Sequence, residues 1–343
     1  MKDFNFAEDV VSTEVVVTDG IGDGGIGVLA GTDLITSSLS NAQKKYYYNL
    51  QFNSKDHFSV TYGHIDGSGS MNQSSTQEGE TKAVYGQFYN LLENDRSALK
   101  SNQGFIINEV TQSDAYFLSV ERLQMKDRLN PGTWTVSLSG SNSTGVATTL
   151  KLTDNSKISD ASAAPFGERY DIISGSAGVQ EGSTKYGFFY PDAGLMVFSA
   201  QQLSASVQGT PAYKTQTNVT PAAFQGNGLC PDHRVADAAD NAHKLAVAIQ
   251  KGSITLRSEE NQYIYDYFCR AKANEFNYSQ NLTFWSGSQY EIRHKDMVNN
   301  PQVYITEVGL YDEVGDLMAI GRLSSALEKN FSSEAIVKVR LTY

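Results

Sequence analysis

The first candidate for chemistry is a glycine-rich stretch near the start of the chain. GIGDGG (20–25) matches the G-x-G-x-x-G pattern of dinucleotide-binding loops and follows the strand-like residues EVVVTD (14–19). Such a loop holds a pyrophosphate only when a helix begins directly after it, because the helix N-terminus faces the phosphates. Gly27 and Gly31 disfavour a helix at this position. We therefore interpret the stretch as a flexible loop and expect no cofactor.

The histidines and cysteines do not form a metal-ligand pattern. Cys230 and His233 lie three residues apart, but no second pair at zinc-finger spacing accompanies them. His57 and His64 would lie on opposite faces of one strand, so they would not share a metal. We expect no metal site. The sequence leaves open whether Cys230 and Cys269 form a disulfide.

Motifs for nucleophilic or carboxylate catalysis are weak as well. The residues GSGS (67–70) lie in a polar loop and lack the helix that follows a G-x-S-x-G nucleophile. Acids are numerous, but sequence spacing does not reveal which carboxylates meet in space as a glycosidase pair. The runs KYYYN and QYIYDYF suit a sugar-binding or protein-binding surface, and equally the packing of an ordinary sheet. We expect a non-enzymatic protein, with a polysaccharide depolymerase as the enzymatic alternative.

Composition narrows the class of partner and the location. A net charge of −11 without a cluster of Lys and Arg argues against nucleic-acid binding. No apolar run approaches the roughly 18 residues of a membrane span. The start, MKDFNFAEDVV, has acids where a signal peptide has its apolar core, and two cysteines suit a reducing cytoplasm. We expect no membrane association and synthesis in a cytoplasm.

Residue usage predicts an α+β fold that is mainly antiparallel β, with sandwich-like modules. The chain has 29 Gly, 19 Tyr and 16 Phe but only 19% charged residues, a balance typical of strands and tight turns. Two helices are expected, near residues 81–93 and 234–250, from apolar residues at helical spacing. The predicted apolar faces are Val84, Phe88, Leu91 and Leu92 in the first, and Val235, Ala239, Ala242, Leu245, Ala246 and Ile249 in the second. Gly252 is predicted to cap the second helix.

The length of 343 residues indicates more than one domain. Residues 1–40 carry many glycines and are expected to form an extended arm that is ordered by a neighbouring surface. Residues 41–155 and 156–343 are expected to form two β-rich domains with one helix each. Alternating apolar residues in 303–343 predict a closing three-strand antiparallel meander.

Three segments resemble virion structural proteins of tailed bacteriophages, notably the large contractile-tailed phages of marine cyanobacteria. They are FSVTYGHIDGSGS with ETKAVYGQFYNLL, then YFLSVERLQMKDRLNPGTWTVSLSG, and finally YITEVGLYDEVGDLMAIGRLSSALEKNFSSEAIVKVRL. In that family an R-L-D/N-P-G-x-W turn precedes a strand, as RLNPGTW (128–134) does here. The family also closes on a GLY-turn-strand pattern similar to residues 308–330.

The resemblance implies a tail, baseplate or neck component that assembles into symmetric rings or anchors fibres, and implies no catalytic residues. The expected partners are further copies of the chain and other phage structural proteins, and the expected location is the virion. Alternatives are a receptor-binding or glycan-binding adhesin, with host surface glycan as its ligand, or a capsid decoration protein. The expected assembly contacts are Gly20, Gly22, Gly25, Tyr304, Leu310, Tyr311, Leu341 and Tyr343.

Overall fold

The computed structural model describes residues 5–21, 28–30, 34–36, 47–70, 79–93, 104–142, 144–207, 229, 240–279 and 281–343. These residues form two compact units. Unit 1 comprises Met1–Val16 and Asn261–Tyr343, and unit 2 comprises Val17–Glu260. The boundary between the units falls within strand β1 (Val10–Gly20) and within strand β17 (Arg257–Ala271).

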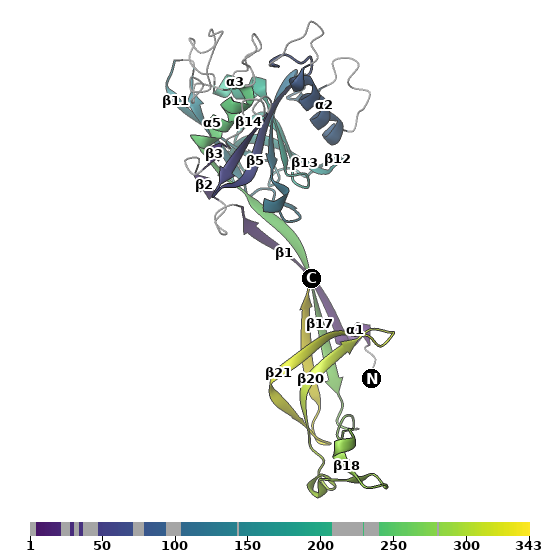
Figure 1. Ribbon diagram of the computed structural model, residues 1–343. Helices are drawn as coiled ribbons and strands as arrows, with labels where there is room; N and C mark the ends of the chain where they lie inside the picture. Colours follow the sequence, from purple (N-terminus) through teal and green to yellow (C-terminus); the bar gives the residue numbers. More distant parts are fainter. Residues whose placement is uncertain are drawn as a thin grey trace. The chain divides into compact units, whose positions relative to one another are not determined.

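Unit 2 is built on one large antiparallel sheet with twelve strands among the described residues (Figure 1). Its order is β2-β16-β10-β11-β13-β14-β15-β8-β5-β4-β3, with β12 on β13. The strands are β2 (Val28–Ala30), β3 (Ile35–Thr36), β4 (Tyr47–Phe52), β5 (Lys55–His64), β8 (Asp114–Val120), β10 (Thr135–Ser141), β11 (Ala147–Asp154), β12 (Ser162–Ala164), β13 (Gly167–Ser176), β14 (Val179–Tyr190), β15 (Leu195–Ser199) and β16 (Ser253–Thr255). Shorter pieces are β6 (Ile106–Ile107) with β7 (Val110–Thr111), and β9 (Arg128–Leu129).

The sheet is curled, and its central strands, such as β8 and β15, are buried on both faces. In β8, Tyr116 and Leu118 belong to the larger core, which also holds the helices α3 (Ala200–Ser206) and α5 (Asp240–Gln250). Phe117 lies on the opposite face, where helix α2 (Glu80–Glu93) covers β5. A strand covered on both sides reads as a nearly continuous apolar run, as YFLSV does.

Both predicted helices are present. In α2, Val84 and Leu92 are buried as expected and Phe88 stacks on Phe117, whereas Leu91 is exposed. In α5, the expected face Ala242, Leu245, Ala246 and Ile249 is buried. The part of that helix predicted before residue 240, including Val235 and Ala239, lies outside the described residues. The class predicted from sequence, α+β with mainly antiparallel β, is confirmed.

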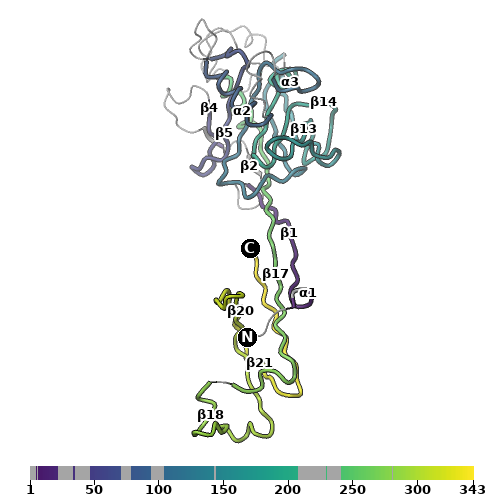
Figure 2. Tube along the Cα trace, turned by 90° about the vertical axis from the view of Figure 1, so that its right-hand side faces the viewer, coloured from purple at the N-terminus to yellow at the C-terminus, as the bar shows by residue number. Residues whose placement is uncertain are grey.

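Unit 1 consists of small antiparallel sheets. β17 pairs with β22 (Ala335–Thr342), and β1 lies on the other side of β17 (Figure 2). The strands β20 (Val303–Tyr311) and β21 (Leu317–Lys329) form a separate hairpin. The remaining elements are α1 (Phe6–Asp9), η5 (Leu282–Phe284), β18 (Trp285–Ser286) with β19 (Glu291–Ile292), and η6 (Lys295–Met297).

The core of unit 1 lies between the hairpin and the β17–β22 pair. Leu310 of the hairpin meets Val337 and Val339 of β22, and partly buried neighbours surround these three. The hairpin has two irregularities. Leu310 pairs with Ala319 while Tyr311 already pairs with Leu317, and Ile305 pairs with Leu327 while Glu307 already pairs with Arg322. Residues 323–326 of β21 therefore bulge opposite Thr306.

The expected three-strand meander is wrong in its pairing. All of the predicted strands exist, but β22 hydrogen-bonds to β17, from Ile264↔Thr342 to Ala271↔Ala335, and not to β21. The apolar row of β22 packs face to face on the hairpin instead. An alternating strand needs a covered face and a paired edge, and these two needs are met here by different neighbours.

The expected arm and domain limits also differ from the structure. The described parts of residues 1–40 are strands paired within the chain itself: β1 with β17, β2 with β16 and β3 with β4. They are extended, as expected, but the surface that orders them belongs to the same chain. The expected boundary between residues 155 and 156 lies inside unit 2, because β11 and β13 are neighbours in one sheet.

Candidate assembly surface

Unit 1 has a small core and a large apolar surface. Most of the exposed large hydrophobic side chains of the described residues lie in this unit, although it is the smaller of the two. The hydrophobic residues that it buries almost completely are Ala271, Leu310, Ala335, Val337 and Val339. Small folding units bury a low fraction of their surface and depend on other sources of stability. The exposed apolar side chains of unit 1 are therefore the candidate surface for contacts with a partner.

The predicted contact residues of the C-terminal strands do not all lie on that surface. Tyr304 and Tyr311 are exposed on β20, and Tyr343 is exposed beside Tyr265. Leu310 is buried in the core of unit 1, and Leu341 packs against that core. The backbone of Tyr343 is paired with Tyr263 through two hydrogen bonds, at 3.0 and 3.3 Å.

Of the predicted glycines, only one can be placed. Gly20 ends β1, and its N–H donates a hydrogen bond to Asp19 Oδ1 at 2.9 Å. Gly22 and Gly25 lie outside the described residues. The structure therefore gives Gly20 a local role at a strand end.

Four large apolar side chains near the tip of the β20–β21 hairpin are exposed. Tyr311 is 47% exposed, Leu317 47%, Met318 70% and Ile320 54%. A Cβ built on Gly309 would lie 3.0 Å from Tyr311 Cε2 and 3.2 Å from Leu317 Cδ1, so both side chains lie over this glycine. We call Tyr311, Leu317, Met318 and Ile320 the hairpin patch.

The hairpin face that carries Gly309 and Ile320 is opposite to the core face of the same hairpin. Val308 pairs with Gly321, whose Cβ position is 3.3 Å from Val339 and so points to the core. Gly309 pairs with Ile320, one residue along on each strand, and therefore points away from the core. Sequence analysis missed Met318 and Ile320. The signal was that LMAIGRL is apolar at alternate positions in both registers, which indicates a strand with two faces to cover.

An ion pair and an acidic turn border the patch. Arg322 Nε lies 3.3 Å from Glu307 Oε2, and both side chains are well exposed. At the tip, Asp312 Oδ1 accepts hydrogen bonds from the N–H groups of Val314, Gly315 and Asp316, at 2.7–3.0 Å. The Asp312 carboxylate thus closes this turn, which also contains Glu313 and Asp316.

The other face of the β17–β22 pair carries basic groups around one acid. Arg340 donates to both oxygens of Asp266, from Nε at 2.8 Å and from Nη2 at 3.0 Å. Lys338 Nζ lies 2.7 Å from Asp266 Oδ2 and 5.7 Å from the centre of the Phe268 ring. Hydrogen bonds from Arg340 and Lys338 hold the pKa of the Asp266 carboxyl well below its usual range.

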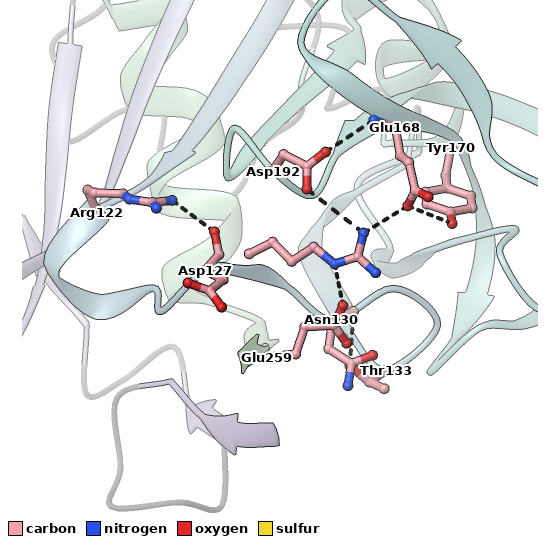
Figure 3. A network of polar contacts seen from close by, with 9 residues as sticks. Arg122, Asp127, Asn130, Thr133, Glu168, Tyr170, Asp192 and Glu259 are labelled. Carbon is pink, nitrogen blue, oxygen red and sulfur yellow. Dashed lines mark hydrogen bonds and ion pairs between the residues drawn. The ribbon is translucent and has the colours of Figure 1, made fainter. Parts of the chain in front are cut away.

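A polar network in unit 2 surrounds Arg128 (Figure 3). Arg128 Nε donates to Glu259 Oε1, and its Nη1 donates to Glu168 Oε2 at 3.0 Å and lies 3.8 Å from Asp192 Oδ1. Burial alone would lower the pKa of Arg128, but the hydrogen bond to Glu259 and the three carboxylate charges raise it. Burial, with Glu168 nearby, raises the pKa of Tyr170 to about 12. This network joins β9, β13 and β17.

The rest of the RLNPGTW segment packs in the core of unit 2 and forms a hydrogen-bonded turn. Leu129 and Trp134 are fully buried, and the Trp134 ring meets Phe189 edge to face at 5.2 Å. Gly132 adopts φ +71°, and its N–H lies 2.9 Å from both carboxylate oxygens of the buried Asp154. The segment that carries part of the family resemblance is therefore a turn fixed by a buried acid and a buried ring.

Unit 2 also has a half-open groove beside the β6–β7 hairpin, with a volume of about 410 Å³. Asn108 anchors that hairpin, because its side chain bonds Lys185 N and O at 3.3 and 2.8 Å. Lys185 Nζ in turn lies 2.7 Å from Asp171 Oδ2. The groove is lined by Ile106, Ile107, Asn108, Glu109, Asp171, Lys185 and Phe188. It offers apolar side chains with a charged pair at one edge.

The cysteines and histidines considered as candidate site residues do not form a shared site among the described residues. Cys269 is a half-buried free thiol in unit 1, and burial raises its pKa; Cys230 and His233 lie outside the described residues. His57 and His64 are buried in β5, where His64 Nδ1 accepts the Asp66 N–H at 3.0 Å. Within the described ranges, His, Cys, Asp and Glu side chains do not gather in a metal-binding group.

None of the described helices has the length and apolarity needed to span a bilayer.

Comparison of the chain with protein-family models, with curated proteins and with solved structures gives no match.

Proposed function

We propose that the chain is a non-enzymatic structural component of a tailed-bacteriophage virion, in the tail, baseplate or neck, and that unit 1 joins it to further copies and to other virion proteins. One observation carries the assembly role: unit 1 leaves most of its large apolar side chains exposed around a core of a few residues. An exposed apolar surface of this extent is typical of a protein-binding region. The virion location is supported by the resemblance of RLNPGTW and of residues 308–330.

The assembly role is tested first on the purified full chain. Sedimentation velocity and light scattering at micromolar concentration are expected to show a defined oligomer. A second full-length sample carries three changes at exposed apolar residues of unit 1: Tyr278→Ser, Leu282→Ser and Val298→Ser. Comparing its self-association with that of the wild type shows whether the copies associate through unit 1 or through unit 2. A chain that stays monomeric throughout the accessible concentration range contradicts the proposal.

The location is tested on particles. Antibodies raised against the chain are expected to label the tail, baseplate or neck of the phage that encodes it, as seen by immuno-electron microscopy. Label spread over the head would favour the alternative of a capsid decoration protein. Label absent from the particle would contradict a virion role of any kind.

A second candidate function, glycan binding, is favoured by the groove in unit 2. Protein grooves that bind small ligands combine apolar walls with a few polar groups, and Phe188 beside Asp171 and Lys185 provides both. A glycan array with the full chain and with Lys185→Ala tests it. Binding that is lost in the variant supports this candidate, and an array without signal removes it.

A further inference from the structure

We propose that Lys329 is an internal cation that clamps the turn after β17 and holds Phe276 in a strained backbone conformation. The inference does not depend on the proposed function, because it concerns how unit 1 keeps its own shape. Lys329 is the last residue of β21 and is fully buried, which is rare for a lysine. A buried ammonium group is unfavourable unless polar atoms surround it, so the atoms around Lys329 show its role.

Three oxygen atoms surround the Lys329 ammonium group. Its Nζ donates to Ala273 O at 3.0 Å, to Asn277 Oδ1 at 2.8 Å and to Asn330 O at 2.8 Å. A lysine has three donors, so each donor has one acceptor. All three acceptors are uncharged, and carbonyl and amide oxygens of this kind also surround bound metal ions. Lys329 therefore acts as a cation that is tethered to the chain by its own side chain.

The ammonium group joins two turns at one end of the β17–β22 pair. Ala273 and Asn277 belong to the turn after β17, and Asn330 begins the turn between β21 and β22. The Asn277 side chain is itself buried, and its Nδ2 donates to Ala273 O at 2.8 Å. We call Lys329 and its three acceptor residues the Lys329 clamp. Its loss would leave the buried Asn277 Oδ1 without a donor, which is unfavourable.

Phe276 lies inside the clamped turn and has an unfavourable backbone conformation. Its φ is +52°, in the left-handed region that residues with a side chain rarely adopt. Its ring is 56% exposed, so burial of the ring does not explain this conformation. The next residue, Asn277, is buried and is held by the ammonium group. Strained backbone persists only where the surrounding structure imposes it, and we attribute the positive φ to the clamp.

Amide hydrogen exchange of the full chain tests the clamp. In Lys329→Ala and in Lys329→Met, the peptides 272–279 and 330–334 are expected to exchange about ten-fold faster or more than in the wild type, because these turns lose their shared donor. Peptides of β8 and β15 in unit 2 are the internal control. Their unchanged exchange shows that each variant still folds.

Chemical rescue tests the charge. Propylammonium replaces the atoms that Lys329→Ala removes, and it is expected to slow the exchange of both peptides again. Propanol has the same carbon chain but no charge and only one donor, so it is the matched control at equal concentration. Propylammonium that has no more effect than propanol overturns the internal cation, as does unchanged exchange in both Lys329 variants.

Glycine substitution tests the strain independently of rescue. Phe276→Gly is expected to slow the exchange of peptide 272–279, because glycine adopts a positive φ freely. In the Lys329→Met background this gain should disappear, since the clamp no longer imposes the conformation. Asn274→Gly is the control, because Asn274 is exposed in the same turn and its φ is not positive. It should speed exchange in both backgrounds.

Two further outcomes would overturn the inference. A gain from Phe276→Gly that is equal with and without Lys329 would show that the clamp does not cause the strain. An intact mass lower than that of the sequence by one ammonia would show an amide bond between Lys329 Nζ and Asn277 Cγ in place of the ammonium group. The expected intact mass is that of the unmodified sequence.

Discussion

Arg128 and Glu259 lie directly opposite each other where β9 pairs with β17, and the Arg128 Nε donates a hydrogen bond to Glu259 Oε1. They are 131 residues apart in the chain. Backbone pairing and side-chain pairing therefore coincide at one point of unit 2. Two further acids, Glu168 and Asp192, face the same guanidinium (Figure 3).

The first prediction concerns this guanidinium. Arg128→Ala is expected to destabilise unit 2 by roughly 1–3 kcal/mol, because it leaves Glu259, which is mostly buried, without its charged donor. Partial exposure of Arg128 limits the cost. Arg128→Lys keeps the charge but loses the fork of donors, so an intermediate value is expected.

The measurement uses urea unfolding followed by Trp134 fluorescence. The chain has two tryptophans, so a Trp285→Phe background leaves Trp134, in the core of unit 2, as the reporter. Arg122→Ala is the matched control, since Arg122 makes one exposed hydrogen bond to Asp127 O at 3.1 Å. Equal effects of the two Ala variants would show that the acids around Arg128 do not depend on it.

The buried Asp154 gives a second prediction. Asp154→Ala removes the acceptor for the Gly132 N–H in a buried turn, and should cost roughly 1–3 kcal/mol. Asp154→Asn retains one acceptor oxygen and should cost less. The same Trp134 assay applies, with the exposed Asp160→Ala as the control that should stay within about 0.5 kcal/mol of the wild type. A neutral Asp154→Ala would mean that the turn holds without its acid.

Two glycines of β14 make a third, paired prediction. A Cβ on Gly187 would lie 1.8 Å from the backbone O of Val197 on β15, so Gly187→Ala should force the strands apart and cost roughly 3 kcal/mol. On Gly182 the closest atom is Ser174 Oγ at 2.6 Å, and this hydroxyl can rotate away. Gly182→Ala should therefore be nearly neutral. Thermal unfolding compares the two variants, and equal melting temperatures would contradict the distinction.

The fourth prediction is a pH dependence in unit 1. The folded pKa of Asp266 is depressed below the ordinary value of about 3.9, so its pairing with Arg340 and Lys338 stabilises unit 1 fully above that value. The contribution is lost as the pH falls below about 3.9 toward the depressed folded pKa. Asp266→Asn should thus be less stable than the wild type at neutral pH, and the difference should shrink in acid.

Amide hydrogen exchange of the β17 and β22 peptides (264–271 and 335–342) follows this difference from neutral pH into acid. Peptides of the sheet in unit 2 serve as the internal control, because Asp266 does not contact them. A difference between Asp266→Asn and the wild type that stays constant down to the lowest pH would contradict the prediction.

The sequence predicted where strands occur better than it predicted which strands pair with each other. Alternation in AIVKVRLT predicts a strand, and β22 is that strand, but the same alternation results whether its edge pairs with β21 or with β17. The partner is determined by a residue stretch more than sixty positions earlier. No local pattern of apolar residues contains that information.

The predicted helix cap at Gly252 is not confirmed, because the structure gives this glycine a different role. Gly252 was expected as a helix cap, which favours a positive φ. Its φ is not in that region, and a Cβ there would instead lie 1.8 Å from Ser137 O on β10. The glycine is required because a strand passes close by, and sequence alone does not distinguish the two reasons.

The candidate surface was predictable in part. Tyr304, Tyr311 and Tyr343 are exposed as expected for contact residues, whereas Leu310 serves the core. Arg128 and its three acids escaped prediction because they come together from four separate parts of the chain. Acids at positions 168, 192 and 259 have no spacing that would indicate one shared guanidinium.

The pairing of β1 with β17 has a consequence for biosynthesis. The ribosome completes β1 about 250 residues before it completes β17, which at typical bacterial rates of roughly 5–20 residues per second is on the order of 10–50 seconds. During that interval an eleven-residue strand with Val11, Val15 and Val16 has no partner of its own chain. Slow translation, or a high density of ribosomes on the message, should therefore favour mispairing between nascent chains at this strand.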